Sequence, residues 1–193
     1  IQTMTRSARS VAQGITNTAI EENVDLIMLG WQGPSRSSST SLGHIVDQVL
    51  KDAPCDVLVM QGEHDALPRK ILVPTAGGPH AKAAARLAAL MTKALQAKVT
   101  LIHVQPQPKT TQRTEENRRR IVETLEGSPM AHPAEQKVLT APSVIEGIVE
   151  EAKGYDLVLI GVSDESTLDR IVFGSIPLQV AARTPTTALV QAH

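Results

Sequence analysis

Short apolar runs alternate with amphipathic stretches along the whole chain. Apolar runs bounded by polar residues, glycine or proline are typical of strands buried on both faces. They predict strands over 24–29, 56–60, 70–74, 99–104, 137–140, 157–160 and 187–191, and the end of another strand in 1–5. Apolar positions three or four residues apart predict helices over about 7–22, 43–52, 80–97, 114–126 and 142–153, and a last helix that begins at Gly174.

This alternation of strands and helices predicts an α/β fold. Parallel strands joined through helices cross over with one hand, so we expect a doubly wound, mainly parallel sheet. Such sheets bind ligands in the crevice outside the carboxyl ends of their strands. If the strand at 70–74 is central, the turn at 74–78 and the loop after Gly161 open on one pocket.

One pattern occurs twice. Asp25-Leu-Ile-Met-Leu-Gly30 is followed by Gly33 and Gly43-His44, and Asp156-Leu-Val-Leu-Ile-Gly161 is followed by Asp164 and Gly174-Ser175. The interval from Gly30 to Gly161 is the same as the interval from Gly43 to Gly174. That interval also gives identities at Ile45/Ile176, Gln48/Gln179, Val49/Val180, Pro54/Pro185, Leu58/Leu189 and Val59/Val190. We interpret these matches as an internal repeat.

The repeat predicts how the chain is divided. Residues 69–193 form a complete module, and residues 1–62 match only its C-terminal half. The polar segment 63–68 between them is the predicted linker. We therefore expect the chain to open in mid-module, either as a piece of a longer polypeptide or with its first half outside these residues.

Each copy places a glycine-bearing loop between a strand and a helix N-terminus. The free N–H groups and the dipole at such a terminus favour an anion such as phosphate, and glycine allows close backbone approach. The simpler alternative is a tight turn with a helix cap, a role that Ser175 or His44 would fill. The candidate nucleotide-binding residues are Gly161, Asp164, Gly174 and Ser175 in the second copy and Gly30, Gly33, Gly43 and His44 in the first.

Composition narrows the function. The 193 residues carry a net charge of −1 and only 2% aromatic residues, which argues against nucleic-acid binding. The single cysteine, Cys55, fits a reducing compartment, and no apolar run reaches the ~18 residues of a membrane span, so we expect a cytoplasmic protein. The six histidines form no metal-ligand spacing, so we expect no histidine metal site. No nucleophile–base set is visible, so we expect no catalysis beyond weak nucleotide hydrolysis. Residues 118–120, three arginines among glutamates, are interpreted as a solvated helix face.

The motifs resemble those of the universal stress protein family. The resemblance lies in Ile71-Leu-Val-Pro74, in Gly161 to Ser175 with the spacing of the family's Gly-x2-Gly-x9-Gly-Ser/Thr motif, and in the closing segment 53–59. It implies a five-stranded parallel sheet of the adenine-nucleotide α-hydrolase-like type in tandem modules, the first incomplete. It further implies ATP or AMP, with Mg, in the crevice. It also implies pairing of modules through their last strands, as a homodimer or a tandem pseudo-dimer. Two positions depart from the pattern: Ala76 stands where nucleotide-binding members carry aspartate, and Asp164 replaces the second motif glycine.

Two functions fit these observations. The first is a non-catalytic regulatory module for stress or signalling with an adenine-nucleotide crevice. The alternative is a cytoplasmic regulatory or interaction domain appended to a membrane transporter, an amino-acid permease or ion exchanger, with degenerate nucleotide sites. The stretch Leu29-Gly-Trp-Gln-Gly33 and the mid-module start suggest this alternative, because they resemble stress-protein domains of such transporters.

Overall fold

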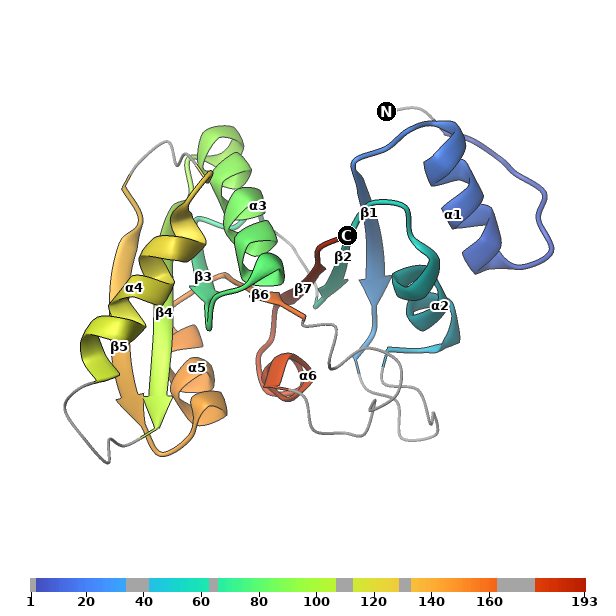
Figure 1. The fold of residues 1–193 in the computed structure, drawn as a ribbon. Coiled ribbons are helices and arrows are strands. Elements are labelled where there is room, and N and C mark those ends of the chain that lie inside the picture. Colours follow the sequence, from blue (N-terminus) through green and yellow to red (C-terminus); the bar gives the residue numbers. More distant parts are fainter. Residues whose placement is uncertain (1–2, 34–41, 63–65, 107–112, 129–132, 163–175) are drawn as a thin grey trace.

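A computed structural model describes residues 3–33, 42–62, 66–106, 113–128, 133–162 and 176–193. Its elements alternate along the chain (Figure 1). The helices are α1 (Val11–Glu21), α2 (His44–Asp52), α3 (Pro79–Leu95), α4 (Arg113–Leu125), α5 (Val144–Ala152) and α6 (Ile176–Ala181). The strands are β1 (Leu26–Trp31), β2 (Asp56–Gln61), β3 (Lys70–Pro74), β4 (Lys98–Pro106), β5 (Glu135–Ala141), β6 (Leu157–Gly161) and β7 (Thr187–Gln191).

The predicted elements agree with these bounds to within about two residues, except near the N-terminus. The predicted start of the last helix, Gly174, lies outside the described residues. Residues 3–5 form no strand, so the strand end predicted in 1–5 is wrong for its described part. The first helix begins at Val11 rather than at residue 7, because Ser10 caps it: the Ser10 side chain accepts a hydrogen bond of 3.2 Å from the backbone N–H of Gln13.

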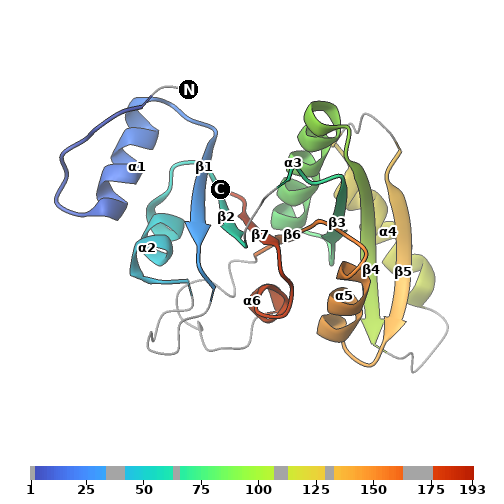
Figure 2. The same cartoon turned by 180° about the vertical axis from the view of Figure 1, so that it is seen from behind.

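The strands form one sheet in the order β1-β2-β7-β6-β3-β4-β5. Strands β7, β6, β3, β4 and β5 are mutually parallel, and helices connect them. The predicted doubly wound, mainly parallel α/β fold is therefore confirmed, with a five-stranded parallel sheet in residues 69–193. Figures 1 and 2 show β1 and β5 at opposite ends of the whole sheet.

The two strands of residues 1–62 join this sheet through one antiparallel pair. Strand β2 pairs with β7, and Val59 lies opposite Leu189. The chain then turns at Gly62, whose φ is +102° and where a Cβ would stand 2.3 Å from the carbonyl oxygen of Pro185. Only glycine fits there, because the positive φ and the close approach of the Pro185 carbonyl both exclude a side chain. The last strands of the two predicted modules are thus paired within one chain.

The two faces of the sheet are covered unequally. One face packs against α1, α2, α5 and α6, through buried residues such as Ala19, Val49 and Val180. The other packs against α3 and α4, through residues such as Ala84 and Ile121. Apolar residues on β2 and β7 contribute to both faces, as expected for central strands of a layered α/β fold.

The two predicted copies have the same parallel pairing of their strands but differ in register. Strand β1 pairs parallel with β2, and β6 pairs parallel with β7. Leu26 lies opposite Asp56 in the first copy, whereas Val158, one position after the equivalent of Leu26, lies opposite Thr187, the equivalent of Asp56. The second pair is therefore shifted by one position, and α6 also ends earlier in its copy than α2 does.

Candidate functional site

The carboxyl ends of β3 and β4 carry a group of interlocked polar side chains. Thr75, which follows β3, is buried, and its Oγ1 lies 2.7 Å from Oγ1 of Thr124 on α4. Thr124 donates its own proton to the carbonyl of Arg120, at 2.7 Å. Thr75 must therefore donate to Thr124, and it accepts from the backbone N–H of Gly77 at 3.0 Å. These bonds fix the turn that leads from β3 to α3.

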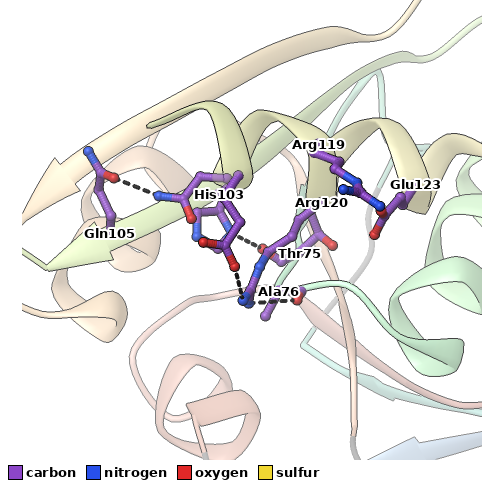
Figure 3. Close-up of polar contacts among 9 residues, drawn as sticks. Thr75, Ala76, His103, Gln105, Arg119, Arg120 and Glu123 are labelled. Atoms are coloured by element: carbon purple, nitrogen blue, oxygen red, sulfur yellow. Dashed lines mark hydrogen bonds and ion pairs between the residues drawn. The ribbon is translucent and has the colours of Figure 1, made fainter. Parts of the chain in front are cut away.

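His103 on β4 completes this group. Its Nδ1 lies 2.8 Å from the carbonyl oxygen of Thr75, which can only accept, so Nδ1 carries a proton. Two residues further on, the amide oxygen of Gln105 accepts from Asn117 at 2.6 Å (Figure 3). His103 and Asn117 are both buried, and the bond from Asn117 to Gln105 adds a polar contact between α4 and the carboxyl end of β4.

Arg120 brings positive charge to the turn. Its guanidinium lies 3.4 Å from the carbonyl oxygen of Ala76 and 3.3 Å from Glu116 of its own helix. Figure 3 shows this side chain directed toward Ala76, whereas Arg119 lies beside Glu123. The Arg120 side chain is 43% exposed, so its charge is open to a ligand at the turn. The solvated helix face predicted for residues 118–120 is present, with ion pairs to Glu115, Glu123 and Glu116.

The first turn of α3 opens beside Arg120. The helix begins at Pro79 after Gly77 and Gly78, both with φ of +88°, and no side chain caps it. A Cβ at either glycine would meet nothing within 4 Å, so no described atom crowds these two positions. Uncapped helix N–H groups attract anions, and the nearby guanidinium adds to that field.

Gly161, the last residue of β6, lies against the backbone of the first turn of α3. A Cβ at Gly161 would lie 2.6 to 2.8 Å from the backbone carbon and oxygen of His80 and the nitrogen of Ala81. Helix packing on β6 therefore accounts for this glycine. His80 is buried, and its Nδ1 accepts a hydrogen bond of 2.9 Å from the backbone N–H of Ala192, which ties the start of α3 to the chain that follows β7.

The remaining candidates of the second copy, Asp164, Gly174 and Ser175, lie outside the described residues. Their part in a site stays a prediction. In residues 69–193 the structure places the end of β6 against the first turn of α3. The loop after Gly161 lies outside the described residues, so the pocket that it was predicted to share with the turn at 74–78 also stays a prediction.

The candidates of the first copy lie at the ends of β1 and α2. Gly30 is exposed near the end of β1. Gly33 has φ of +89° and packs beside the Gln61 side chain. Gly43, with φ of +98°, is the N-cap residue of α2, and no side chain caps that helix. His44 is the first helical residue, so the alternative in which its side chain caps α2 is wrong.

Sequence reasoning missed the polar group formed by Thr75, His103, Asn117 and Thr124. A signal was present, since His103 and Gln105 interrupt the end of an otherwise apolar strand, where a parallel sheet binds its ligands. Among the described residues, no group of three or more His, Cys, Asp or Glu side chains could hold a metal ion.

Comparison with known proteins agrees with this architecture. A model of the universal stress protein family matches residues 2–61 and 68–191, and the chain belongs to that family. No curated protein matches the chain.

Solved structures share the fold at low sequence identity. A universal stress protein in complex with cAMP has a TM-score of 0.54 at 18% identity and covers 66% of this chain and 99% of that chain. A universal stress protein from Archaeoglobus fulgidus DSM 4304 has a TM-score of 0.65 at 20% identity, covering 94% of this chain and 64% of that one. A functionally unknown protein from Pseudomonas aeruginosa PAO1 has a TM-score of 0.64 at 16% identity, covering 96% and 69%. The present chain thus spans about two thirds of the length of the last two.

Proposed function

We propose that the protein is a non-catalytic regulatory member of its family that binds an adenine nucleotide at the carboxyl ends of β3 and β6. The observation that carries this proposal is the uncapped first turn of α3 beside the Arg120 guanidinium. Two adjacent glycines keep the approach open there. A nucleotide phosphate would accept from the free N–H groups and neutralise the exposed guanidinium.

The relative that was solved with cAMP supports the choice of ligand class. ATP and AMP are the further candidates, with Mg²⁺ as a counter-ion for the polyphosphate. Ala76 cannot supply the carboxylate that the family resemblance implies at its position, so the proposal places the ligand's main attraction at its phosphate end. The predicted residues Asp164, Gly174 and Ser175, and the first copy's Gly33, Gly43 and His44, remain proposed contributors.

Calorimetric titration tests this function. The protein would be titrated with ATP, AMP and cAMP, each with and without Mg²⁺. Replacing Arg120 by glutamine should weaken the binding of the preferred nucleotide by about tenfold, the effect of losing one charge-assisted hydrogen bond. Arg118→Gln is the matched control, because Arg118 is 66% exposed and pairs only with Glu115 among described residues; it should change affinity by less than about twofold.

A gain-of-function variant sharpens the test. Ala76 is exposed, so Ala76→Asp introduces the family's carboxylate without disturbing the core. It should tighten nucleoside binding if the crevice is a nucleotide site. If neither the parent protein nor Ala76→Asp gives a heat of binding with any of the three nucleotides, the proposed function is refuted.

A second candidate is an interaction domain with a degenerate crevice, and Ala76 is the observation that favours it. Its attachment to a membrane transporter stays a proposal. No helix in the described ranges has the length and apolar character needed to cross a bilayer. Sequencing the gene upstream of the codon for Ile1 tests the idea, because a transporter requires several apolar segments of about 20 residues there.

A further inference from the structure

A polar pocket lies at the amino ends of β3, β4 and β5, beside the end of α5. Its volume is about 410 Å³, which is within the range of small-molecule sites. The candidate nucleotide crevice lies at the carboxyl ends of the strands, so this amino-end pocket is a separate feature of the sheet. The residues that line it are mostly charged or polar and include Lys70, Lys98, Thr100, Lys137, Glu151 and Tyr155.

Two lysines stand side by side at this end of the sheet. Lys70 and Lys98 are the first residues of β3 and β4, and they lie opposite each other in the parallel register. Side chains alternate between the two faces along a strand. Leu72 and Ile102, an even number of residues further on, pack in the same apolar cluster as Ile148 of α5. Both lysine side chains therefore leave the sheet on the α5 face, from strands about 4.8 Å apart.

These two lysines have no counter-charge. Within the described part of the chain, the ammonium group of neither Lys70 nor Lys98 forms a hydrogen bond or an ion pair. The carbonyl groups at the end of α5, those of Glu150, Glu151 and Ala152, already accept from backbone N–H groups of the following turn at 3.0 to 3.3 Å. Like charges directly opposite each other on neighbouring strands destabilise a sheet. The pair therefore offers two positive charges and all of its N–H donors to a ligand.

The third lysine of the pocket is paired and uses up the nearby carboxylates. Nζ of Lys137 lies 3.0 Å from Oε1 of Glu151 and 3.5 Å from Oε1 of Glu135. Oε1 of Glu151 also lies 3.4 Å from the hydroxyl of Tyr155, which donates to it, and Oε2 of Glu135 accepts from Thr100 at 3.2 Å. These carboxylates are therefore committed to other groups and do not neutralise the first two lysines.

Glu151 still has one oxygen that can contact a ligand. Its Oε2 has no partner among the described residues, and its side chain is 23% exposed. An ionised carboxylate oxygen only accepts hydrogen bonds, so it suits a hydroxyl group. The amino-end pocket thus combines two cations at the strand ends with a hydroxyl acceptor on α5.

We propose that the amino-end pocket binds a small phosphate monoester that carries hydroxyl groups, of the sugar phosphate class. The phosphate group lies between Lys70 and Lys98, because a phosphate dianion can neutralise both lysines whereas a single carboxylate would neutralise one. A hydroxyl group of the sugar donates to Oε2 of Glu151. The proposal is independent of nucleotide binding, since it uses the opposite end of the sheet.

Calorimetric titration of the 193-residue protein with glucose 6-phosphate tests the proposal. Glucose should give no heat of binding, and inorganic phosphate should bind at least about fivefold more weakly than the ester, because it lacks the hydroxyl contact. Lys70→Gln and Lys98→Gln should each weaken binding of the ester by about tenfold. Lys51→Gln is the matched control, because Lys51 is an exposed lysine on α2 without a partner among the described residues, and it should change affinity by less than about twofold.

Thermal melts give a second measurement that does not depend on heats of binding. Without ligand, Lys98→Gln should leave the melting temperature unchanged or raise it slightly, because it removes a pair of like charges. Glucose 6-phosphate at about ten times its Kd should raise the melting temperature of the parent by about 4 °C. The same concentration should raise that of the double variant Lys70→Gln/Lys98→Gln by less than about 1 °C.

Three results would overturn the proposal. The first is no binding of glucose 6-phosphate by either measurement, and the second is an affinity for it that the double variant does not change. The third is an affinity no higher than that for inorganic phosphate, which would remove the sugar contact. Arg120→Gln separates this site from the nucleotide crevice: it should leave the affinity for glucose 6-phosphate unchanged, and a loss there would place the phosphate at the turn after β3 instead.

Discussion

Strands β1 and β6 compare two environments for nearly the same sequence. Both begin after aspartate, carry an apolar run and end at or next to glycine. Strand β6 has a strand on each side and a helix on each face, whereas among the described residues β1 has one strand neighbour and one face without a helix. The comparison shows that a buried-strand pattern predicts a strand, but the number of neighbours decides how much stability each residue contributes.

The largest expected difference concerns the apolar residues at the middle of each strand. Leu159→Ala should lower the free energy of unfolding by about 3 kcal/mol, because a fully buried leucine leaves a cavity. Met28→Ala should cost less than about 0.5 kcal/mol, since its side chain is mostly exposed. Urea unfolding followed by circular dichroism measures both. Equal losses would show that the face of β1 is covered in solution.

The next largest difference in the free energy of unfolding is expected between substitutions of Gly161 and Gly30. Gly161→Ala forces a methyl group into the backbone of α3 and should cost about 2 kcal/mol. Gly30→Ala meets no neighbour and should leave stability unchanged or raise it by about 0.5 kcal/mol, because alanine restricts the unfolded chain. The same urea titrations apply. Destabilisation by Gly30→Ala would mean that a backbone already contacts β1.

The aspartates should give a smaller contrast. Asp156→Asn weakens two charge-assisted hydrogen bonds to the start of β3 and should cost about 1 kcal/mol. Asp25→Asn should be neutral within about 0.3 kcal/mol, because no described residue donates to it. Thermal melts of the two variants and the parent, at one pH and ionic strength, measure the difference. A melting temperature lowered equally by both would contradict the comparison.

The smallest expected effect concerns the reactivity of Cys55, which has no cysteine equivalent in the second copy. Burial, and then the negative charge of Asp56, raise the pKa of the Cys55 thiol. Because the thiolate is the reactive form, alkylation at neutral pH should be slower than that of an unstructured cysteine. Asp56→Asn removes a cause of the rise, so it should lower the pKa and speed alkylation. The rate of iodoacetamide labelling against pH measures this, and an unchanged profile in Asp56→Asn would be the contrary result.

The fold could be predicted from sequence because its signals are local. The strand at 70–74 is bounded by Lys70 and Pro74 in the sequence and in the structure. Hydrogen bonds between side chains of different elements could not be predicted from such local signals. The bond between Thr75 and Thr124 joins residues 49 positions apart, and no periodicity marks either as a partner of the other.

At the candidate site, too, the sequence predicted local features but not contacts between distant residues. The glycine spacing predicted where strands end and where helices begin: Gly161 is the last residue of β6, and Gly43 is the N-cap of α2. It could not show which glycines face a ligand and which face protein. At Gly161 the neighbour is the backbone of His80, which belongs to a helix much earlier in the chain.

The antiparallel pairing of β2 with β7 has a practical consequence. Its hydrogen bonds do not depend on the peptide that joins β2 to β3, so a cut after the exposed Leu67 leaves both pieces held edge to edge. Residues 1–67 and 68–193, expressed separately, would then reassemble into one sheet. The two fragments are therefore suited to a complementation experiment. A bulky residue in place of Gly62 would clash with Pro185 and prevent their association.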